Sequence, residues 1–178
     1  MPVYAGVGSR ETPPAAIAVI EKLAQLMGKA GYLLRTGGAV GADMAFLRGH
    51  KTASVSGPVP VPEIYLPWPK YNFDVLGPFR ETAAVFADPT GDAIQLARQF
   101  HPAWGRCSGG AKKLHGRNSQ ILCGFYLNEP VDFVVCWHNN SGGTMQAIRL
   151  AQSKGIKIYH VAIQKDVVAL LERIAKRQ

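Results

Sequence analysis

The stretch 3–10, VYAGVGSR, is a short apolar run that stops in a glycine turn. From Pro13-Pro14 onward, apolar residues recur at three- and four-residue steps up to Gly28, which is the period of an amphipathic helix. A strand that is apolar throughout, rather than alternating with polar residues, is buried on both faces. A buried strand followed by a helix therefore predicts the α/β class, with a parallel sheet that helices cover on both sides.

The alternation of strand and helix continues to the end of the chain. Apolar runs predict strands at 3–7, 32–36, 63–67, 131–137 and 156–161. Helical periodicity predicts helices at 13–28, 39–50, 88–100, 115–127, 142–154 and 165–176. We expect a Rossmann-like sheet of about five strands in the order 3-2-1-4-5. Residues 1–178 then form one domain, with a loop at 51–62 and an irregular, aromatic-rich insertion at about 68–105.

The composition is that of an ordinary globular domain with a basic balance. Twenty Lys and Arg residues against twelve Asp and Glu give a formal net charge of +8, which favours phosphates or nucleic acid as partners. No apolar stretch reaches the roughly 18 residues of a membrane span, and the N-terminus lacks the basic start of a signal peptide. Cys107, Cys123 and Cys136 fit no metal-binding spacing and indicate a reducing compartment. We therefore expect a cytoplasmic protein with no membrane contact, no cofactor and no metal cluster.

Glycine clusters follow three of the predicted strands, at the carboxyl ends where parallel sheets place their ligands. They are Gly6 and Gly8 after the first strand, Gly37, Gly38 and Gly41 after the second, and Gly142 and Gly143 after the fourth. Glycine lets the backbone approach a phosphate closely, and the next helix N-terminus adds free N–H groups; a tight turn alone is the other interpretation. Ser141 and Thr144 could donate hydroxyls to a ligand or cap the helix. These loops match neither a P-loop nor the dinucleotide fingerprint.

Charged residues stand beside these loops. Arg10 follows the first glycine turn, where a guanidinium can grip a phosphate or form a surface ion pair. Asp43 lies in the first turn of its helix, where a carboxylate satisfies free N–H groups. A second basic group precedes the helix predicted at 115–127, and consists of Lys112, Lys113, His115 and Arg117.

Four motifs in this order resemble the SLOG superfamily of Rossmann-like proteins. They are Gly8-Ser9-Arg10, the loop 36–43 (TGGAVGAD), the helix start 115–118 (HGRN) and the turn 141–144 (SGGT). This superfamily includes the DNA-processing protein DprA (Smf) and the Lonely Guy phosphoribohydrolases. The resemblance covers residues 3–162 and is closest to small DprA-like proteins of phages and bacteria. It implies a homodimer that pairs through helices beside the ligand pocket.

The Lonely Guy branch implies cleavage of the N-glycosidic bond of nucleoside monophosphates. Arg117 matches the catalytic Arg of that branch, but the position of its catalytic Glu is occupied by Ala147. This cleavage needs a carboxylate to steady the oxocarbenium ion or to activate water, and Asp132, at the start of a strand, is a poor substitute. The sequence therefore predicts no catalytic residue, and a nucleotide N-glycosidase with a displaced acid is kept as an alternative.

The DprA branch implies binding of single-stranded DNA. Arg10, the loop 37–43 and Arg117-Asn118 match its pattern, and Thr36 stands in place of its usual Ser. We predict a binding protein whose partner is a nucleotide or single-stranded nucleic acid, and a sensor for a nucleotide signal would use the same pocket. The predicted ligand-binding residues are Gly8, Ser9, Arg10, Gly37, Gly38, Asp43, Arg117, Asn118, Ser141, Gly142, Gly143 and Thr144.

Overall fold

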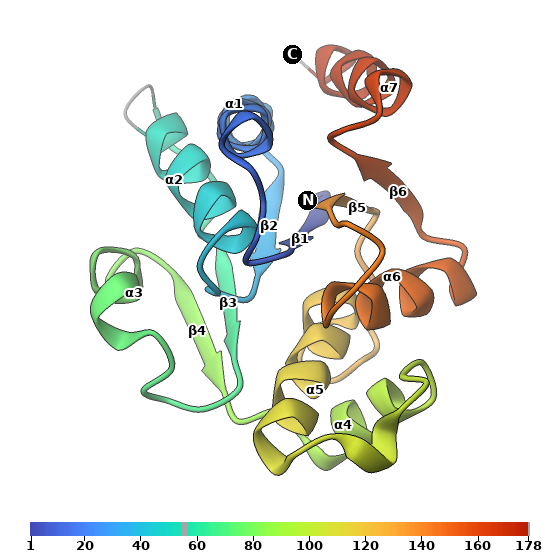
Figure 1. The fold of residues 1–178 in the computed structure, drawn as a ribbon. Helices are drawn as coiled ribbons and strands as arrows, with labels where there is room; N and C mark the ends of the chain where they lie inside the picture. Colours follow the sequence, from blue (N-terminus) through green and yellow to red (C-terminus); the bar gives the residue numbers. More distant parts are fainter. Residues whose placement is uncertain (55–56, 178) are drawn as a thin grey trace.

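A parallel sheet runs through the centre of the computed structural model, which describes residues 1–54 and 57–177 (Figure 1). Its strands are β1 (Val3–Gly8), β2 (Leu33–Thr36), β3 (Glu63–Leu66), β4 (Ala84–Ala87), β5 (Phe133–Trp137) and β6 (Lys157–His160). They lie in the order β4-β3-β2-β1-β5-β6, and every neighbouring pair is parallel. The predicted Rossmann-like α/β class is confirmed.

The predicted strand number and the order 3-2-1-4-5 are wrong, because β4 adds a sixth strand at the edge beside β3. Residues 84–87 lie in register opposite residues 63–66, and the ring of Phe86 stacks on Tyr65 with centroids 5.0 Å apart. The strand has four residues, of which two are alanine, so its pattern does not stand out from the segment around it. The five predicted strands keep their expected neighbours within the larger sheet.

Helices cover both faces of the sheet (Figure 1). One face packs against α1 (Pro14–Lys29), α2 (Ala42–Ser54) and α7 (Gln164–Ala175), and the other against α5 (Gly109–Cys123) and α6 (Thr144–Ser153). The helix α4 (Gly91–Arg98) packs on α5, and α3 (Phe73–Arg80) contributes to the core of the first face. Within the described ranges, no helix combines the length and the apolar character that a bilayer crossing requires.

Adjacent residues of β1 face the two opposite layers. Tyr4 packs in one core with Ile20 of α1 and Phe46 of α2. Ala5 lies in the other core with Ile121 of α5. All five of these side chains are fully buried. The strand is therefore covered on both sides, which explains why its sequence is apolar at every position.

The prediction that the segment 68–105 is irregular is wrong. This segment contains α3, β4 and α4, and it leads into a 3-10 turn at Trp104–Arg106. Within it, α4 matches the predicted helix, and the Thr90 hydroxyl caps it by accepting from the Ala93 amide at 3.2 Å. The helix α2 extends to Ser54, so residues 51–54 of the predicted loop are helical. Residues 55 and 56 of that loop lie outside the described residues.

The start of α5 is also corrected, from residue 115 to Gly109. The Ser108 hydroxyl accepts a hydrogen bond from the Ala111 amide at 3.2 Å and caps the helix six residues earlier than the sequence indicates. Residues 112–114 therefore lie inside the helix rather than before it. Their side chains project from fixed positions on two faces of α5, and only one of these faces borders the pocket described below.

The buried imidazole of His50 predicts a pH-dependent stability. Its Nε2 lies 2.7 Å from the Pro60 carbonyl oxygen, and burial lowers its pKa below the usual value. In the unfolded chain this histidine takes up a proton near pH 6.5, whereas the folded state takes it up only at a lower pH. The free energy of unfolding should therefore fall as the pH falls below 6.5, with a slope from this group of at most about 1.4 kcal/mol per pH unit.

Urea denaturation at several pH values would measure this dependence. His50→Gln keeps a donor for the Pro60 carbonyl but cannot titrate, so the slope should be shallower in this variant. Equal slopes in the two proteins would show that His50 does not contribute.

Candidate functional site

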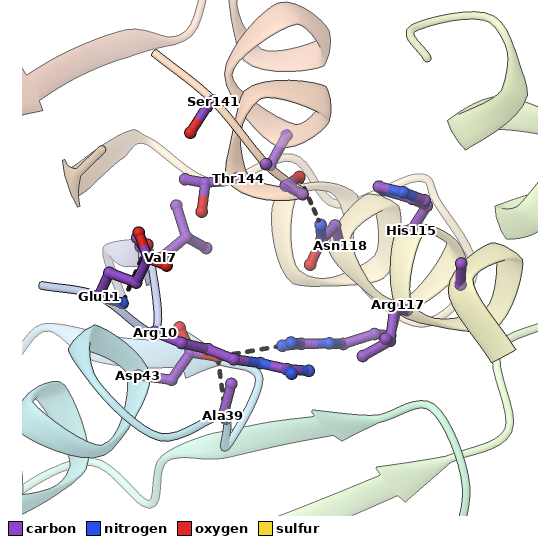
Figure 2. Close-up of a pocket in the computed structure, with 17 residues that line it drawn as sticks. Val7, Arg10, Glu11, Ala39, Asp43, His115, Arg117, Asn118, Ser141 and Thr144 are labelled. Atoms are coloured by element: carbon purple, nitrogen blue, oxygen red, sulfur yellow. Dashed lines mark hydrogen bonds and ion pairs between the residues drawn. The ribbon is translucent and has the colours of Figure 1, made fainter. Parts of the chain in front are cut away.

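A pocket of about 410 Å³ opens at the carboxyl ends of β1, β2 and β5 (Figure 2). The chain leaves β1 toward β2 on one side and later returns to β5 on the other, so the strand order reverses at β1. Open α/β sheets place their ligands in the crevice at such a reversal. The volume lies in the range of about 300–1,000 Å³ that small-molecule sites occupy.

The structure brings most of the predicted residues to this one pocket. Ten of the twelve line it, namely Gly8, Ser9, Arg10, Asp43, Arg117, Asn118, Ser141, Gly142, Gly143 and Thr144. They come from four separate stretches of the chain, at 8–10, 43, 117–118 and 141–144. Their contact with a ligand stays a prediction, whereas their convergence is a feature of the fold.

The two remaining glycines have structural roles beside the pocket. A Cβ at Gly37 would overlap the guanidinium of Arg117, so this glycine provides the space that Arg117 occupies. Gly38 has a φ of +70°, and a Cβ there would meet a Leu76 methyl at 2.9 Å. The first glycine thus admits a pocket side chain, and the second allows a turn that packs against α3.

A buried ion pair connects two of the site helices. The Arg117 Nη1 of α5 lies 3.1 Å from the Asp43 Oδ2 of α2, and the two side chains are only 8% and 4% exposed. The same carboxylate oxygen accepts a hydrogen bond from the Ala39 amide at 3.1 Å. Burial raises the pKa of the Asp43 carboxyl, and the charge of Arg117 opposes that rise. Asp43 therefore fixes both the loop before α2 and the position of Arg117.

Arg10 lies at the mouth of the pocket and keeps its charge available. Its Nη2 donates a hydrogen bond to the Tyr71 hydroxyl at 3.1 Å, and Tyr71 in turn packs edge-on against Trp68. Among the described residues no carboxylate pairs with Arg10, so the surface ion pair considered for it does not form. Figure 2 shows the Arg10 and Arg117 side chains next to each other.

The N-terminus of α6 forms the opposite wall. Gly142 has a φ of +73°, and Gly143 precedes the helix without a side-chain cap. Neither Ser141 nor Thr144 caps α6, because the Ser141 hydroxyl instead donates to the Asn139 side-chain oxygen at 2.7 Å. The Met145 and Gln146 amides donate to the Gly142 and Gly143 carbonyl oxygens at 3.3 Å, which leaves the Gly143 and Thr144 N–H groups, among the described residues, for a ligand. These free groups carry the partial positive charge of the helix N-terminus. This wall is therefore suited to an anion.

Asn118 holds the α6 wall in place. Its side-chain nitrogen lies 3.3 Å from both the Gly143 carbonyl oxygen and the Gln146 Oε1, and it donates to both. Asn118 thus ties α5 to the first turn of α6. Its role in the structure is to hold the first turn of α6 against α5.

The pocket contains residues that the sequence did not single out as ligand-binding. They are Val7, Glu11, Ala39, Ala111, Leu114, His115 and Ala147. Glu11 is an exposed carboxylate next to Arg10 in the chain, and only the folded pocket shows that it faces a site. Ala147, where the Lonely Guy resemblance implies a glutamate, lines this pocket with a methyl group.

Asp132 cannot supply the missing carboxylate. Its Oδ2 accepts a hydrogen bond from the Val3 amide at 2.7 Å, at the amino ends of β1 and β5. The pocket lies at the opposite, carboxyl ends of these strands. The structure thus agrees with the expectation that Asp132 is a poor substitute for the glutamate.

The sequence indicated a histidine without a partner at position 115, but the structure places two potential partners beside His115. Its ring lies 4.4 Å from that of His101, and the Cys107 sulfur lies in the same cluster. Burial, followed by the nearby His101, lowers the pKa of His115 to about 4, so the imidazole is neutral at pH 7. The expectation of no metal-ligand cluster is thus corrected, because the 101–107 segment folds back onto α5.

Fold and site together define a Rossmann-like α/β protein with an anion-suited pocket at its switch point. The sequence matches no protein-family model and no curated protein. Among solved structures, it is similar to DNA processing protein A from Helicobacter pylori, with a TM-score of 0.62 and 20% identity. The match covers 89% of this chain and 64% of that protein, which binds single-stranded DNA. It establishes a DprA-like fold.

A second similar structure is the molybdenum cofactor carrier protein of Chlamydomonas reinhardtii. That match has a TM-score of 0.46 and 14% identity, and covers 98% of both chains.

Proposed function

We propose that the pocket binds a nucleotide through its phosphate. The observation that carries this proposal is the convergence of Arg10, Arg117 and the α6 N-terminus on one pocket of about 410 Å³. Guanidinium groups and helix N-termini are the two features that proteins use most directly for phosphate. Because Arg117 is already paired with Asp43, Arg10 and the Gly142–Thr144 backbone supply most of the free positive charge.

Glu11 extends this proposal from phosphate to nucleotide. An acidic side chain commonly accepts hydrogen bonds from ribose hydroxyls in Rossmann-type sites. Glu11 lies on the exposed rim of the pocket, beside Arg10. A phosphate on the α6 wall and a ribose at the rim would use both ends of the pocket.

Single-stranded DNA is the second candidate ligand. It is favoured by the fold shared with the DNA processing protein of H. pylori and by the formal charge of +8. The two lysines of the basic group at the start of α5 already have partners, however. Lys113 Nζ lies 2.8 Å from Asp88 Oδ1, and Lys112 Nζ lies 5.9 Å above the Trp104 ring. We therefore favour the nucleotide.

Arg10→Ala should weaken nucleotide binding by about 10–100-fold, the effect of losing one or two charge-assisted hydrogen bonds. Isothermal titration calorimetry with AMP, GMP, CMP, UMP and their deoxy forms would measure it. Lys165→Ala removes the same charge from α7, away from the pocket, and should leave the affinity unchanged. Equal weakening by the two variants would assign the effect to net charge and would contradict the proposed site.

Oligonucleotides of different lengths distinguish the two candidates. If DNA is the ligand, log K should fall with log salt by about 0.7 per phosphate contacted, and affinity should rise with length. The double variant Lys112→Ala, Lys113→Ala should then bind DNA more weakly. If a nucleotide is the ligand, this variant should bind it normally. Tight, length-dependent binding that needs both lysines would replace the nucleotide proposal.

A homodimer stays a prediction from the family resemblance. The large apolar residues Ile121 and Leu122 of α5 are fully buried within this chain, so they are not available to a partner. Light scattering at micromolar concentration would give the mass, and a monomer would contradict the prediction.

A further inference from the structure

A second polar cluster lies behind the pocket wall, where the loop after α4 folds onto α5. It contains His101 and Cys107 from the loop and His115 from α5. One nitrogen or sulfur atom from each residue lies within 4.8 Å of those of the other two. The Cys107 sulfur is 3.7 Å and 3.8 Å from the two ring nitrogens of His101. Three side chains that bind metals well are thus held together by the tertiary fold.

His115, the buried member of this cluster, has a ring nitrogen without a partner. Its side chain is buried, with the residue only 7% exposed, and its Nδ1 has no hydrogen-bond partner among the described residues. Buried nitrogen atoms in native proteins nearly always have a partner, and leaving one without costs free energy. A cation at the centre of the cluster would provide that partner.

We propose that His101, Cys107 and His115 bind a divalent cation of the zinc class. Two imidazoles and one thiolate are a ligand set that suits Zn²⁺, and they suit the hard cations Mg²⁺ and Ca²⁺ poorly. In tetrahedral coordination, Zn–N bonds of about 2.0–2.1 Å and Zn–S bonds of about 2.3 Å place ligand atoms roughly 3.3–3.7 Å apart. The distance of 3.7 Å between the Cys107 sulfur and the His101 Nδ1 is already close to this range, and the other pairs of ligand atoms lie within 4.8 Å. On binding, the Cys107 thiol gives its proton to solvent.

The cation would connect the loop to the ligand pocket. Three protein ligands leave a fourth tetrahedral position for water or another oxygen ligand. His115 also lines the pocket, and its Cε1 lies 3.6 Å from where a Cβ on Gly143 would stand. Binding would therefore fix the segment 101–107 against α5 and hold His115 against the anion-binding wall. His101 and Cys107 are only partly buried, which leaves a path for the ion to enter.

Cobalt provides a direct test, because Co²⁺ takes the coordination of Zn²⁺ and reports its ligands by colour. The whole protein is freed of metal with a chelator, kept reduced and titrated with Co²⁺. We expect one Co²⁺ per chain, with a thiolate-to-metal charge-transfer band and the strong visible bands of a tetrahedral site, and we expect Zn²⁺ to bleach both. A wild-type protein without the charge-transfer band at one equivalent of Co²⁺ would overturn the proposal.

Variants assign the ligands. Cys107→Ser should abolish the charge-transfer band, and His101→Gln should weaken Zn²⁺ binding by more than the roughly 10–100-fold that loss of an outer-shell group causes. His101 is half-buried, so its variant should fold even if His115→Gln does not. His138→Gln is the control, since His138 pairs with His160 outside the cluster and its loss should leave binding unchanged. A band that persists in Cys107→Ser, or unchanged affinity in His101→Gln, would contradict the site. Neither measurement requires a nucleotide.

Discussion

Arg117→Met should lower the free energy of unfolding by about 3–5 kcal/mol, which is typical of removing one partner from a buried ion pair. The loss is expected because the Asp43 side chain is only 4% exposed, so its carboxylate would stay buried without a counter-charge. Methionine retains most of the aliphatic packing of the arginine, so the charge accounts for most of the effect. Urea denaturation followed by circular dichroism would measure it.

A surface pair of the same chemistry provides the control. Arg48 and Glu21 form an ion pair at 2.6 Å, but their side chains are 47% and 38% exposed. Arg48→Met should therefore cost no more than about 1 kcal/mol. Adding Asp43→Asn to Arg117→Met should recover part of the loss, because it removes the stranded charge. If the double variant were less stable by the full sum of the single effects, the pair would not be coupled and this account would fail.

Gly37→Ala tests the same pair without touching either charge. The added methyl would overlap the Arg117 guanidinium, so the side chain must leave its position beside Asp43. The backbone at Gly37 has no left-handed conformation, so an alanine meets no strain of its own there. We expect a loss of stability that approaches that of Arg117→Met. A fully stable Gly37→Ala protein would mean that Arg117 can reach Asp43 by another route.

Gly143→Asp should weaken nucleotide binding by at least about 100-fold, which corresponds to roughly 2.7 kcal/mol, while the protein stays folded. The new carboxylate would stand at the N-terminus of α6, occupy the positive end of the helix and repel a phosphate. Calorimetry with the nucleotide that binds best to the wild type would measure the affinity, and thermal denaturation would confirm the fold.

Gly143→Ala separates charge from space. The nearest atom to an added Cβ is the His115 Cε1 at 3.6 Å, an ordinary contact, and the φ of Gly143 is −66°. Alanine should therefore fit, and its affinity should stay within a few-fold of the wild type. If the folded aspartate variant bound its nucleotide as well as the alanine variant, the α6 wall would not be part of the binding site.

Local patterns predicted the parts of this protein that depend on neighbours in the chain. The buried strand 3–7 follows from a continuous apolar run, because both of its faces are covered. The helix after it follows from apolar residues three and four positions apart, because one of its faces is buried. The glycines at 37, 38 and 142 were likewise visible, since a left-handed or crowded backbone admits little else. The order of strands around β1 then placed these turns at one edge of the sheet.

Weak local signals explain the errors in the fold. The strand β4 has four residues and takes its position from pairing with β3. The helix α5 begins with Gly109-Gly110, a pair of residues typical of a loop. Close packing against α4, farther along α5, stabilises the helix. A Cβ at Gly116 would lie 2.7 Å from Ile94 of α4, so glycine lets the two helices approach closely. Such packing overrides local propensity and leaves no periodic pattern.

By itself, the sequence determined the α/β class, the glycine turns at the strand ends and ten residues that meet in one pocket. Only the tertiary structure decided which of them pair. Arg117 and Asp43 stand 74 positions apart in the chain. Their ion pair exists because α5 and α2 pack on opposite faces of the sheet and meet at the carboxyl ends of its strands. The cluster of His101, Cys107 and His115 depends in the same way on a loop that folds back. Periodicity records which face of an element is buried, but contacts between distant elements depend on how those faces pack, and no local pattern carries that information.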